Sequence, residues 1–149
     1  SSGAYKDLPK NIMKGVKATL PGVFTNDELK KRLLGVDPAL TDFSYAPESY
    51  DAVVLIALAA EQGKGTDGTT IRDNLASASS GGTKCTTFAE CKTLIAAGTD
   101  IDYDGVSGAI EFDATGDPSV ATMGVYEYVA NDKYEARAAE FITGAVPAA

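Results

Sequence analysis

The chain has 149 residues, of which 44% are hydrophobic and 23% charged, and this composition is typical of one ordinary globular domain. Its net charge of −8 and isoelectric point of about 4.4 describe a surface that repels phosphate backbones, so nucleic acid is not an expected partner. Because the chain contains no histidine, it lacks the commonest general base and the commonest metal ligand, and we expect neither an enzyme nor a cofactor.

The first strand and the first helix are predicted near the N-terminus. Residues 14–20 alternate enough between apolar and polar side chains to predict a short strand, which the following Pro-Gly pair ends. The letters TNDE, which begin at Thr25, form a capping box with threonine first and glutamate three residues later. They predict a helix that starts there and stops at Gly35.

A longer helix is predicted from Pro47 to Gly63. Proline and the carboxylate of Glu48 both suit a first helical turn, where the proline lacks only an amide hydrogen that would have no partner and the carboxylate meets the positive end of the helix. The middle of the helix, residues 52–60, is apolar all round, so we expect other elements to enclose it. This apolar run is far shorter than the roughly 20 residues that span a bilayer.

Two further helices and two strands follow. Residues 69–78 predict a short helix, and a second capping box, TFAE from Thr87, opens another helix that Gly98 ends. Residues 106–112 and 122–129 predict strands, and the alternation is clearest in the second.

The last predicted segment is a tail from Asn131, which is polar and then alanine-rich, and we expect it to fray. The elements together predict an α/β fold with about four helices and three strands, whereas a sheet covered by helices on both faces usually has about five or six strands. The sheet is therefore expected to be incomplete. Either a second copy or a part of the protein outside this chain would complete it.

The acidic stretch from Asp100 to Glu111, DIDYDGVSGAIE, fits the calcium-loop pattern D-x-[DN]-x-[DN]-G-x5-E letter for letter. Asp100, Asp102, Asp104 and Glu111 are therefore candidate metal ligands. An EF-hand also needs a helix on each side and usually an apolar residue at the eighth position, where this chain has Ser107. The residues that follow alternate like a strand, so an acidic loop that enters a strand is the favoured interpretation. A weaker cation site and a calcium-binding module stay as alternatives.

Cys85 and Cys91 lie six residues apart, too far to be bridged along one continuous helix. If Thr87 is the N-cap, Cys85 lies two residues outside the helix and Cys91 is its fourth residue, which is nearly the geometry of a hydrophobic staple, and a disulfide becomes feasible. Such a small loop would contribute about 2 kcal/mol in the chain-entropy model, and the bridge would imply an oxidising compartment. Two free buried thiols are the alternative. No metal site is expected from two cysteines without histidine.

Five segments, taken in order, carry a resemblance to a known family: GVKATLPG, DPALTDFSYAPESYDAVVLIALAA, IRDNLASASSGGTKCTTFAEC, DYDGVSGAIEFDATGDP and GVYEYVANDKYE. They cover most of the chain from Gly15 to Glu135. The chain resembles the C-terminal portion of type I periplasmic solute-binding proteins, specifically the branched-chain amino-acid-binding family of ABC importers. The resemblance implies a partial three-layer α/β lobe whose sheet is incomplete in this chain. It also implies that Tyr103 to Gly108 lead through a crossing strand and turn, not through an EF-hand.

The resemblance implies a division of the chain into four segments. Residues 1–22 would form a crossing strand with its lead-in segment, 23–104 the helical part of one lobe, 105–135 the crossing strands that return through the hinge, and 136–149 a tail. The first βα units and nearly all of the second lobe of such proteins have no counterpart in this sequence. Because a truncated lobe exposes strand edges and an apolar helix, we expect the chain to form a homodimer or to swap segments.

In such proteins two lobes close on a small ligand, which implies binding without catalysis. Tyr45 aligns with the aromatic residue that packs on the ligand side chain, although composition alone favours ordinary packing for it, and Glu48 is a second candidate one helical turn later. The implied function is that of the ligand-binding component of an ABC importer, for a branched-chain amino acid or a related small polar solute, with an incomplete site in this fragment. It would act with a permease in the membrane, from the periplasm or as a cell-surface lipoprotein. A ligand-sensing receptor domain of the same fold is the alternative.

Overall fold

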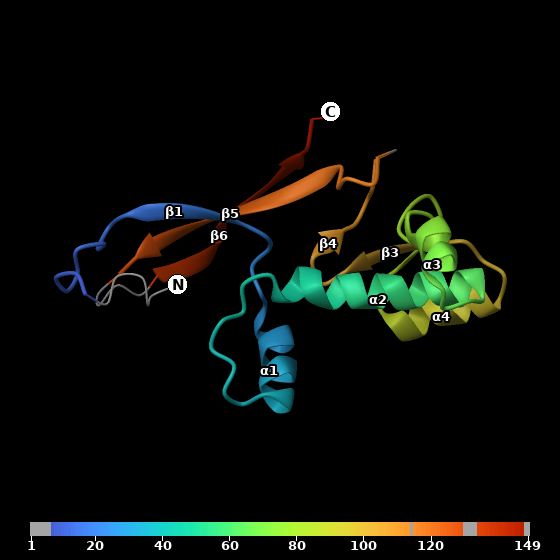
Figure 1. The fold of residues 1–149 in the computed structure, drawn as a ribbon, viewed down its shortest axis with the longest axis horizontal. Coiled ribbons are helices and arrows are strands. Elements are labelled where there is room, and N and C mark those ends of the chain that lie inside the picture. Colours follow the sequence, from blue (N-terminus) through green and yellow to red (C-terminus); the bar gives the residue numbers. More distant parts are fainter. Residues whose placement is uncertain (1–6, 114, 130–133, 148–149) are drawn as a thin grey trace.

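The computed structural model describes residues 7–113, 115–129 and 134–147, with the backbone alone described for 134–139. These residues form a long antiparallel sheet and, beside it, a group of helices around a small second sheet (Figure 1). The strand order is β1-β5-β6 in the long sheet and β2-β3-β4 in the small one. The chain leaves the long sheet after β1, builds the helical body (residues 23–109) and returns to the sheet at β5 (Figure 1).

The long sheet consists of β1 (Lys17–Pro21), β5 (Val120–Tyr128) and β6 (Tyr134–Ala145). The central strand β5 runs antiparallel to both neighbours, and its first residue, Val120, lies opposite Ala145 of β6. The strands predicted at 14–20 and 122–129 are confirmed, with shifted ends. The expectation that the tail frays is wrong for Tyr134–Ala145, because these residues form β6, and ladder hydrogen bonds to β5 hold this strand despite the low β propensity of alanine. Residues 131–133 and 148–149 of the tail lie outside the described residues.

The helical body holds α1 (Asp27–Val36), α2 (Ala46–Gly63), α3 (Gly68–Leu75), β2 (Thr83–Cys85), α4 (Phe88–Ala96), β3 (Ile101–Gly105) and β4 (Gly108–Ala109). The four predicted helices are confirmed, with ends that differ by a few residues. The strand predicted at 106–112 is confirmed only at Gly108–Ala109, which form the short β4. The longer strand comes earlier, as β3, and the chain reverses at Val106 and Ser107 between the two. A parallel pair of strands, β2 beside β3, with helices packed around it, makes this body a partial α/β lobe.

One of the two predicted capping boxes forms and the other does not. At α4 the hydroxyl of Thr87 accepts a hydrogen bond from the N–H of Glu90 (3.2 Å), as predicted. At α1 the N-cap is Asn26, whose side-chain oxygen accepts from the N–H of Leu29 (2.9 Å), and not Thr25. The hydroxyl of Thr25 instead donates to the carbonyl of Phe43 (3.0 Å), a partner 18 residues away, so a tertiary contact has displaced the local one.

The core of the helical body lies where α2, α4 and β3 meet. Leu58 of α2, Cys91 of α4 and Ile101 of β3 are all fully buried there. On its other side α2 exposes Val53 to 68% and Ile56 to 46%. The expected enclosure of this helix is therefore wrong for the described elements, which cover one face of it, and the open apolar face agrees with an incomplete sheet. No helix in the described ranges is long and apolar enough to cross a membrane.

The cap of α3 should make the stability of this helix depend on pH. The carboxylate of Asp67 accepts hydrogen bonds from the hydroxyl of Thr70 (2.6 Å) and from the N–H groups of Thr70 (3.0 Å) and Thr69 (3.1 Å), and these bonds lower the pKa of Asp67. Because the folded pKa lies below the unfolded value of about 3.9, the stabilisation is fully present above that pH and is lost as the pH falls through the folded pKa.

We expect Asp67→Asn to weaken the pH dependence of the free energy of unfolding between about pH 5 and pH 2, measured by denaturant titration at each pH. Asp73→Asn is the matched control on the same helix, because Asp73 is exposed and pairs only with its neighbour Arg72 among the described ion pairs. Equal pH dependence in the wild type and in Asp67→Asn would contradict the role given to this cap.

Candidate ligand-binding site

Tyr45 immediately precedes α2 and adopts a left-handed backbone conformation with a φ of 60°. Bulky residues rarely adopt this conformation. The carbonyl of Tyr45 accepts a hydrogen bond from the N–H of Ser49 (2.9 Å), so the start of α2 holds the residue in place. Its side chain is 44% exposed and lines a pocket at the surface.

This pocket, which we call the Tyr45 pocket, has a volume of about 280 Å³ and lies between the loop before α2 and the long sheet. It is lined by Asp42, Ser44 and Tyr45 from the loop, by Ala18, Thr19 and Leu20 from β1, and by Tyr126 and Tyr128 from β5. Both the helical body and the long sheet therefore contribute to it. Its volume is close to the lower end of the range of about 300–1,000 Å³ for ligand pockets and suits a molecule of amino-acid size.

Asp42 adds a negative charge to the Tyr45 pocket. Its Oδ1 accepts a hydrogen bond from the N–H of Ser44 (3.0 Å), and the bonds from Ser44 lower the pKa of Asp42. The carboxylate is therefore ionised at neutral pH. A carboxylate beside three tyrosine rings suits an ammonium group, because ring faces attract cations, and the rings also suit an apolar chain. The pocket can thus hold a small molecule that has an amino group and an apolar body.

Sequence reasoning found Tyr45 but missed the residues that complete its pocket. Tyr126 and Tyr128 are two positions apart in β5, so they lie on one face of the strand. The sequence YEY is the local pattern that indicates this shared face. The pairing of β1 with β5, in which Ala18 lies opposite Tyr126, brings the two strands to the same pocket. This pairing joins residues more than a hundred positions apart, so no local pattern indicates it.

Glu48 does not line the Tyr45 pocket. It lines a separate groove of about 420 Å³ between α2 and the long sheet. Its Oε1 accepts a hydrogen bond from the N–H of Val23 (2.6 Å), in the segment that follows β1. The structure thus places the two predicted ligand-binding residues on different cavities, and a ligand contact for Glu48 stays a prediction.

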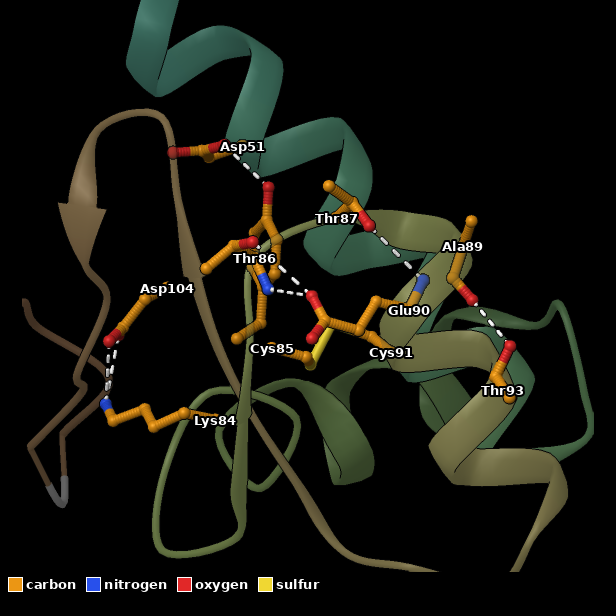
Figure 2. The surroundings of a disulfide bond; sticks show 11 residues. Asp51, Lys84, Cys85, Thr86, Thr87, Ala89, Glu90, Cys91, Thr93 and Asp104 are labelled. Carbon is orange, nitrogen blue, oxygen red and sulfur yellow. Dashed lines mark hydrogen bonds and ion pairs between the residues drawn. A yellow bond between two sulfur atoms is a disulfide. The ribbon is translucent and has the colours of Figure 1, made fainter.

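Asp51 is a buried carboxylate that sequence reasoning missed. It is 1% exposed and accepts hydrogen bonds from the hydroxyl of Tyr103 (2.7 Å) and from the N–H groups of Val106 (3.1 Å) and Ser107 (2.6 Å), as well as from the Ser107 hydroxyl. Figure 2 shows it on α2, beside the hairpin that follows β3. A Cβ at Gly105 would collide with the carboxylate of Asp51, so only glycine fits there. Burial and the bond to Asp51 raise the pKa of Tyr103, which stays a neutral donor.

The acidic segment 100–111 forms a hairpin, not the helix-loop-helix of an EF-hand. The ammonium group of Lys84 lies 2.9 Å from a carboxylate oxygen of Asp104 (Figure 2) and 3.0 Å from one of Asp102. Asp100 is exposed, and Glu111 accepts a hydrogen bond from the hydroxyl of Ser119 (3.4 Å). Within the described residues, no group of three or more potential ligand side chains is placed to hold a metal ion. The EF-hand arrangement is therefore wrong. The segment that matches the calcium pattern instead forms the paired strands β3 and β4, and two of its carboxylates form ion pairs with Lys84.

Cys85 and Cys91 form a disulfide, with 5.4 Å between their Cα atoms, and the predicted bridge is confirmed (Figure 2). Cys85 ends β2, and Cys91 lies in α4 after the predicted N-cap, Thr87. Both cysteines are buried, at 1% and 0% exposure. The bridge therefore ties the edge strand of the small sheet to α4 from within the core.

Comparison with known proteins finds one family. The model of the receptor family ligand binding region matches residues 23–131, which is well over half of the chain and includes the whole helical body and β5. No curated protein and no solved structure matches the chain.

Proposed function

The chain belongs to the receptor family of ligand binding regions, which includes the type I periplasmic binding proteins, and we propose that its Tyr45 pocket binds a small solute that carries an amino group. The observation that carries this proposal is the pocket itself. Tyr45, which the resemblance singled out, faces it together with Tyr126, Tyr128 and the ionised Asp42.

A branched-chain amino acid is the proposed ligand. Its ammonium group would lie against Asp42 and its apolar side chain against the ring of Tyr45, as charge and apolar surface require. Binding of this kind needs no catalytic group. The resemblance implies ligand contacts beyond these residues, and we propose that the pocket supplies one wall of the binding site.

The proposed partner is the membrane permease of an ABC importer, to which the protein would deliver its ligand. The proposed location is outside the cytoplasm, either in the periplasm or at the cell surface as a lipoprotein. The Cys85–Cys91 disulfide supports this location, because such bridges persist in oxidising compartments. A ligand-sensing receptor domain is the second candidate, and the description of the matching family as a receptor family favours it. The homodimer or segment swap stays a prediction, which the exposed Val53 and Ile56 of α2 support.

Calorimetric titration of leucine into the chain tests the proposed function. We expect saturable binding, and we expect Tyr45→Ala to weaken it about tenfold through the loss of the aromatic wall. Tyr50→Ala is the matched control, because Tyr50 lies in α2 only five residues after Tyr45, interacts with Arg32 and does not line the pocket.

The role of the amino group needs a second ligand. 4-Methylpentanoate keeps the apolar chain and the carboxylate of leucine but lacks its ammonium group, so we expect it not to bind. Absence of heat with leucine, equal affinity of Tyr45→Ala and the wild type, or equal binding of 4-methylpentanoate would each count against the proposed site.

A further inference from the structure

The first two turns of α2 carry two carboxylates that hold backbone segments next to the long sheet. Glu48 accepts a hydrogen bond from the N–H of Val23 (2.6 Å), and Asp51 accepts from the N–H groups of Val106 (3.1 Å) and Ser107 (2.6 Å). Residues three apart lie on the same face of a helix. One face of α2 therefore holds both the segment that leaves the sheet and the hairpin from which the chain returns to it.

The bond to Glu48 lies where the chain leaves the sheet. The N–H of Gly22 still donates to the carbonyl of Thr122 in β5 (2.9 Å), whereas the N–H of the next residue, Val23, donates to Glu48. Two consecutive amides thus fasten the chain to the long sheet and then to α2. Gly22 has a φ of +117°, and a Cβ there would lie 3.2 Å from the Oε1 of Glu48, so the turn brings the backbone close to this carboxylate.

Apart from the hydrogen bond from Val23, few polar interactions position the side chain of Glu48 among the described residues. Its Oε2 is buried and makes no hydrogen bond to any described residue, and none of the ion pairs among the described residues includes it. The contact with Val23 is therefore the polar interaction that positions this side chain.

An open groove separates the two parts at this point. Leu55 and Ala52 of α2 line one side of it, and Pro21, Thr122 and Thr143 of the long sheet line the other, across a volume of about 420 Å³. Side chains of α2 are therefore not packed tightly against the sheet here. The angle between the helical body and the sheet must depend largely on the connecting segments and on the bonds that hold them.

We propose that Glu48 is a positioning residue: its hydrogen bond to Val23 sets the angle between the long sheet and the helical body, and thereby the width of the Tyr45 pocket. Asp51 anchors the return hairpin on the same helical face. The Tyr45 pocket takes its walls from both parts, so a change in their angle moves Tyr45 relative to Tyr126 and Tyr128. The effect on the angle needs no ligand, and only the effect on affinity rests on the proposed function.

Spin-label distance measurement tests the angle directly. Ile142→Cys in β6, a site that is 70% exposed, and Ala76→Cys after α3, also exposed, place one label on each part, and both native cysteines are already bridged. We expect a single narrow distance distribution in the labelled wild type. Glu48→Ala should widen it by about twofold, because the bond that favours one angle is lost. Glu48→Gln keeps an acceptor oxygen for Val23 and should keep the distribution narrow.

A second test variant and a control variant complete the distance measurement. Glu48→Asp keeps the charge but shortens the side chain, so it should widen the distribution as Glu48→Ala does, and it serves if the alanine variant does not fold. Glu61→Ala, at the other end of α2, removes an exposed ion pair with Lys92 and should change nothing.

Leucine titration separates the two proposals. Glu48→Ala should lower the affinity for leucine about tenfold, although Glu48 does not line the Tyr45 pocket. An unchanged distance distribution in Glu48→Ala and Glu48→Asp would overturn the positioning role, whether or not leucine binds. A widened distribution in a protein that binds no leucine would support the positioning role and would count against the proposed ligand.

Discussion

Replacing Asp51 with alanine is expected to lower the free energy of unfolding by about 4 kcal/mol, because buried donors left without a partner cost about 1–3 kcal/mol each. The carboxylate accepts from the hydroxyls of Tyr103 and Ser107 and from two backbone N–H groups, and it is 1% exposed. Water can replace the carboxylate at the partly exposed Ser107 but not at the buried Tyr103. The melting temperature should fall by roughly 10 °C in a chain of this size.

A local measurement should accompany the thermal one. Hydrogen exchange at the amides of Val106 and Ser107 should accelerate in Asp51→Ala, since both amides lose their acceptor. Asp51→Asn keeps one acceptor oxygen and should lose less stability than the alanine variant. Asp73→Ala, an exposed aspartate, is the control and should change stability by less than about 1 kcal/mol. An Asp51→Ala protein with unchanged melting and exchange would show that the hairpin does not depend on this carboxylate.

Reduction of the Cys85–Cys91 disulfide is expected to lower the free energy of unfolding by about 2 kcal/mol, the value that the chain-entropy model assigns to so short a loop. The bridge joins β2 to α4 inside the core, where both cysteines are at most 1% exposed. Reduced wild-type protein keeps both sulfur atoms, so its core volume changes little, and the difference from oxidised protein reports mainly the loss of the covalent link. The measurement is denaturant unfolding of oxidised protein and of protein refolded under reducing conditions.

The double variant Cys85→Ala/Cys91→Ala provides the control for this experiment. Its stability should not respond to reductant, because neither thiol remains. Its stability should also lie below that of the reduced wild type, because alanine leaves space where buried sulfur packed. If oxidised and reduced wild type unfold at the same denaturant concentration, the bridge does not stabilise the fold.

The candidate site was predictable only in part. Tyr45 came from a resemblance in the letters around it, and the structure places it on a pocket. Asp42, three residues earlier, was equally visible in the sequence, but nothing local indicates that its carboxylate shares a pocket with tyrosines from β5. Glu48 lies one helical turn after Tyr45, yet the two residues line different cavities. Glu48 lines the groove between α2 and the long sheet, whereas Tyr45 lines the pocket between that sheet and the loop before α2.

The sequence by itself determined the four helices, the disulfide and the incomplete α/β character of the chain. These features depend on signals that act within a few residues: the cap at Thr87, the proline in the first turn of α2, and two cysteines whose spacing suits a helix start. The interactions behind these signals do not depend on residues that are distant in sequence. The features can therefore be predicted from the sequence alone.

Only the tertiary structure decided the strand β6, the hairpin of β3 and β4, and the contacts of the carboxylates. The alanine-rich end becomes β6 because β5 offers it backbone partners, and the letters of a calcium loop become a hairpin because Asp51, which lies 55 positions before Val106, accepts its amides. Ladder hydrogen bonds and the need to satisfy a buried carboxylate act across long separations in sequence. These long-range interactions override the local conformational preference of the segments that they join. The sequence pattern of such a segment therefore does not predict the structure that it adopts.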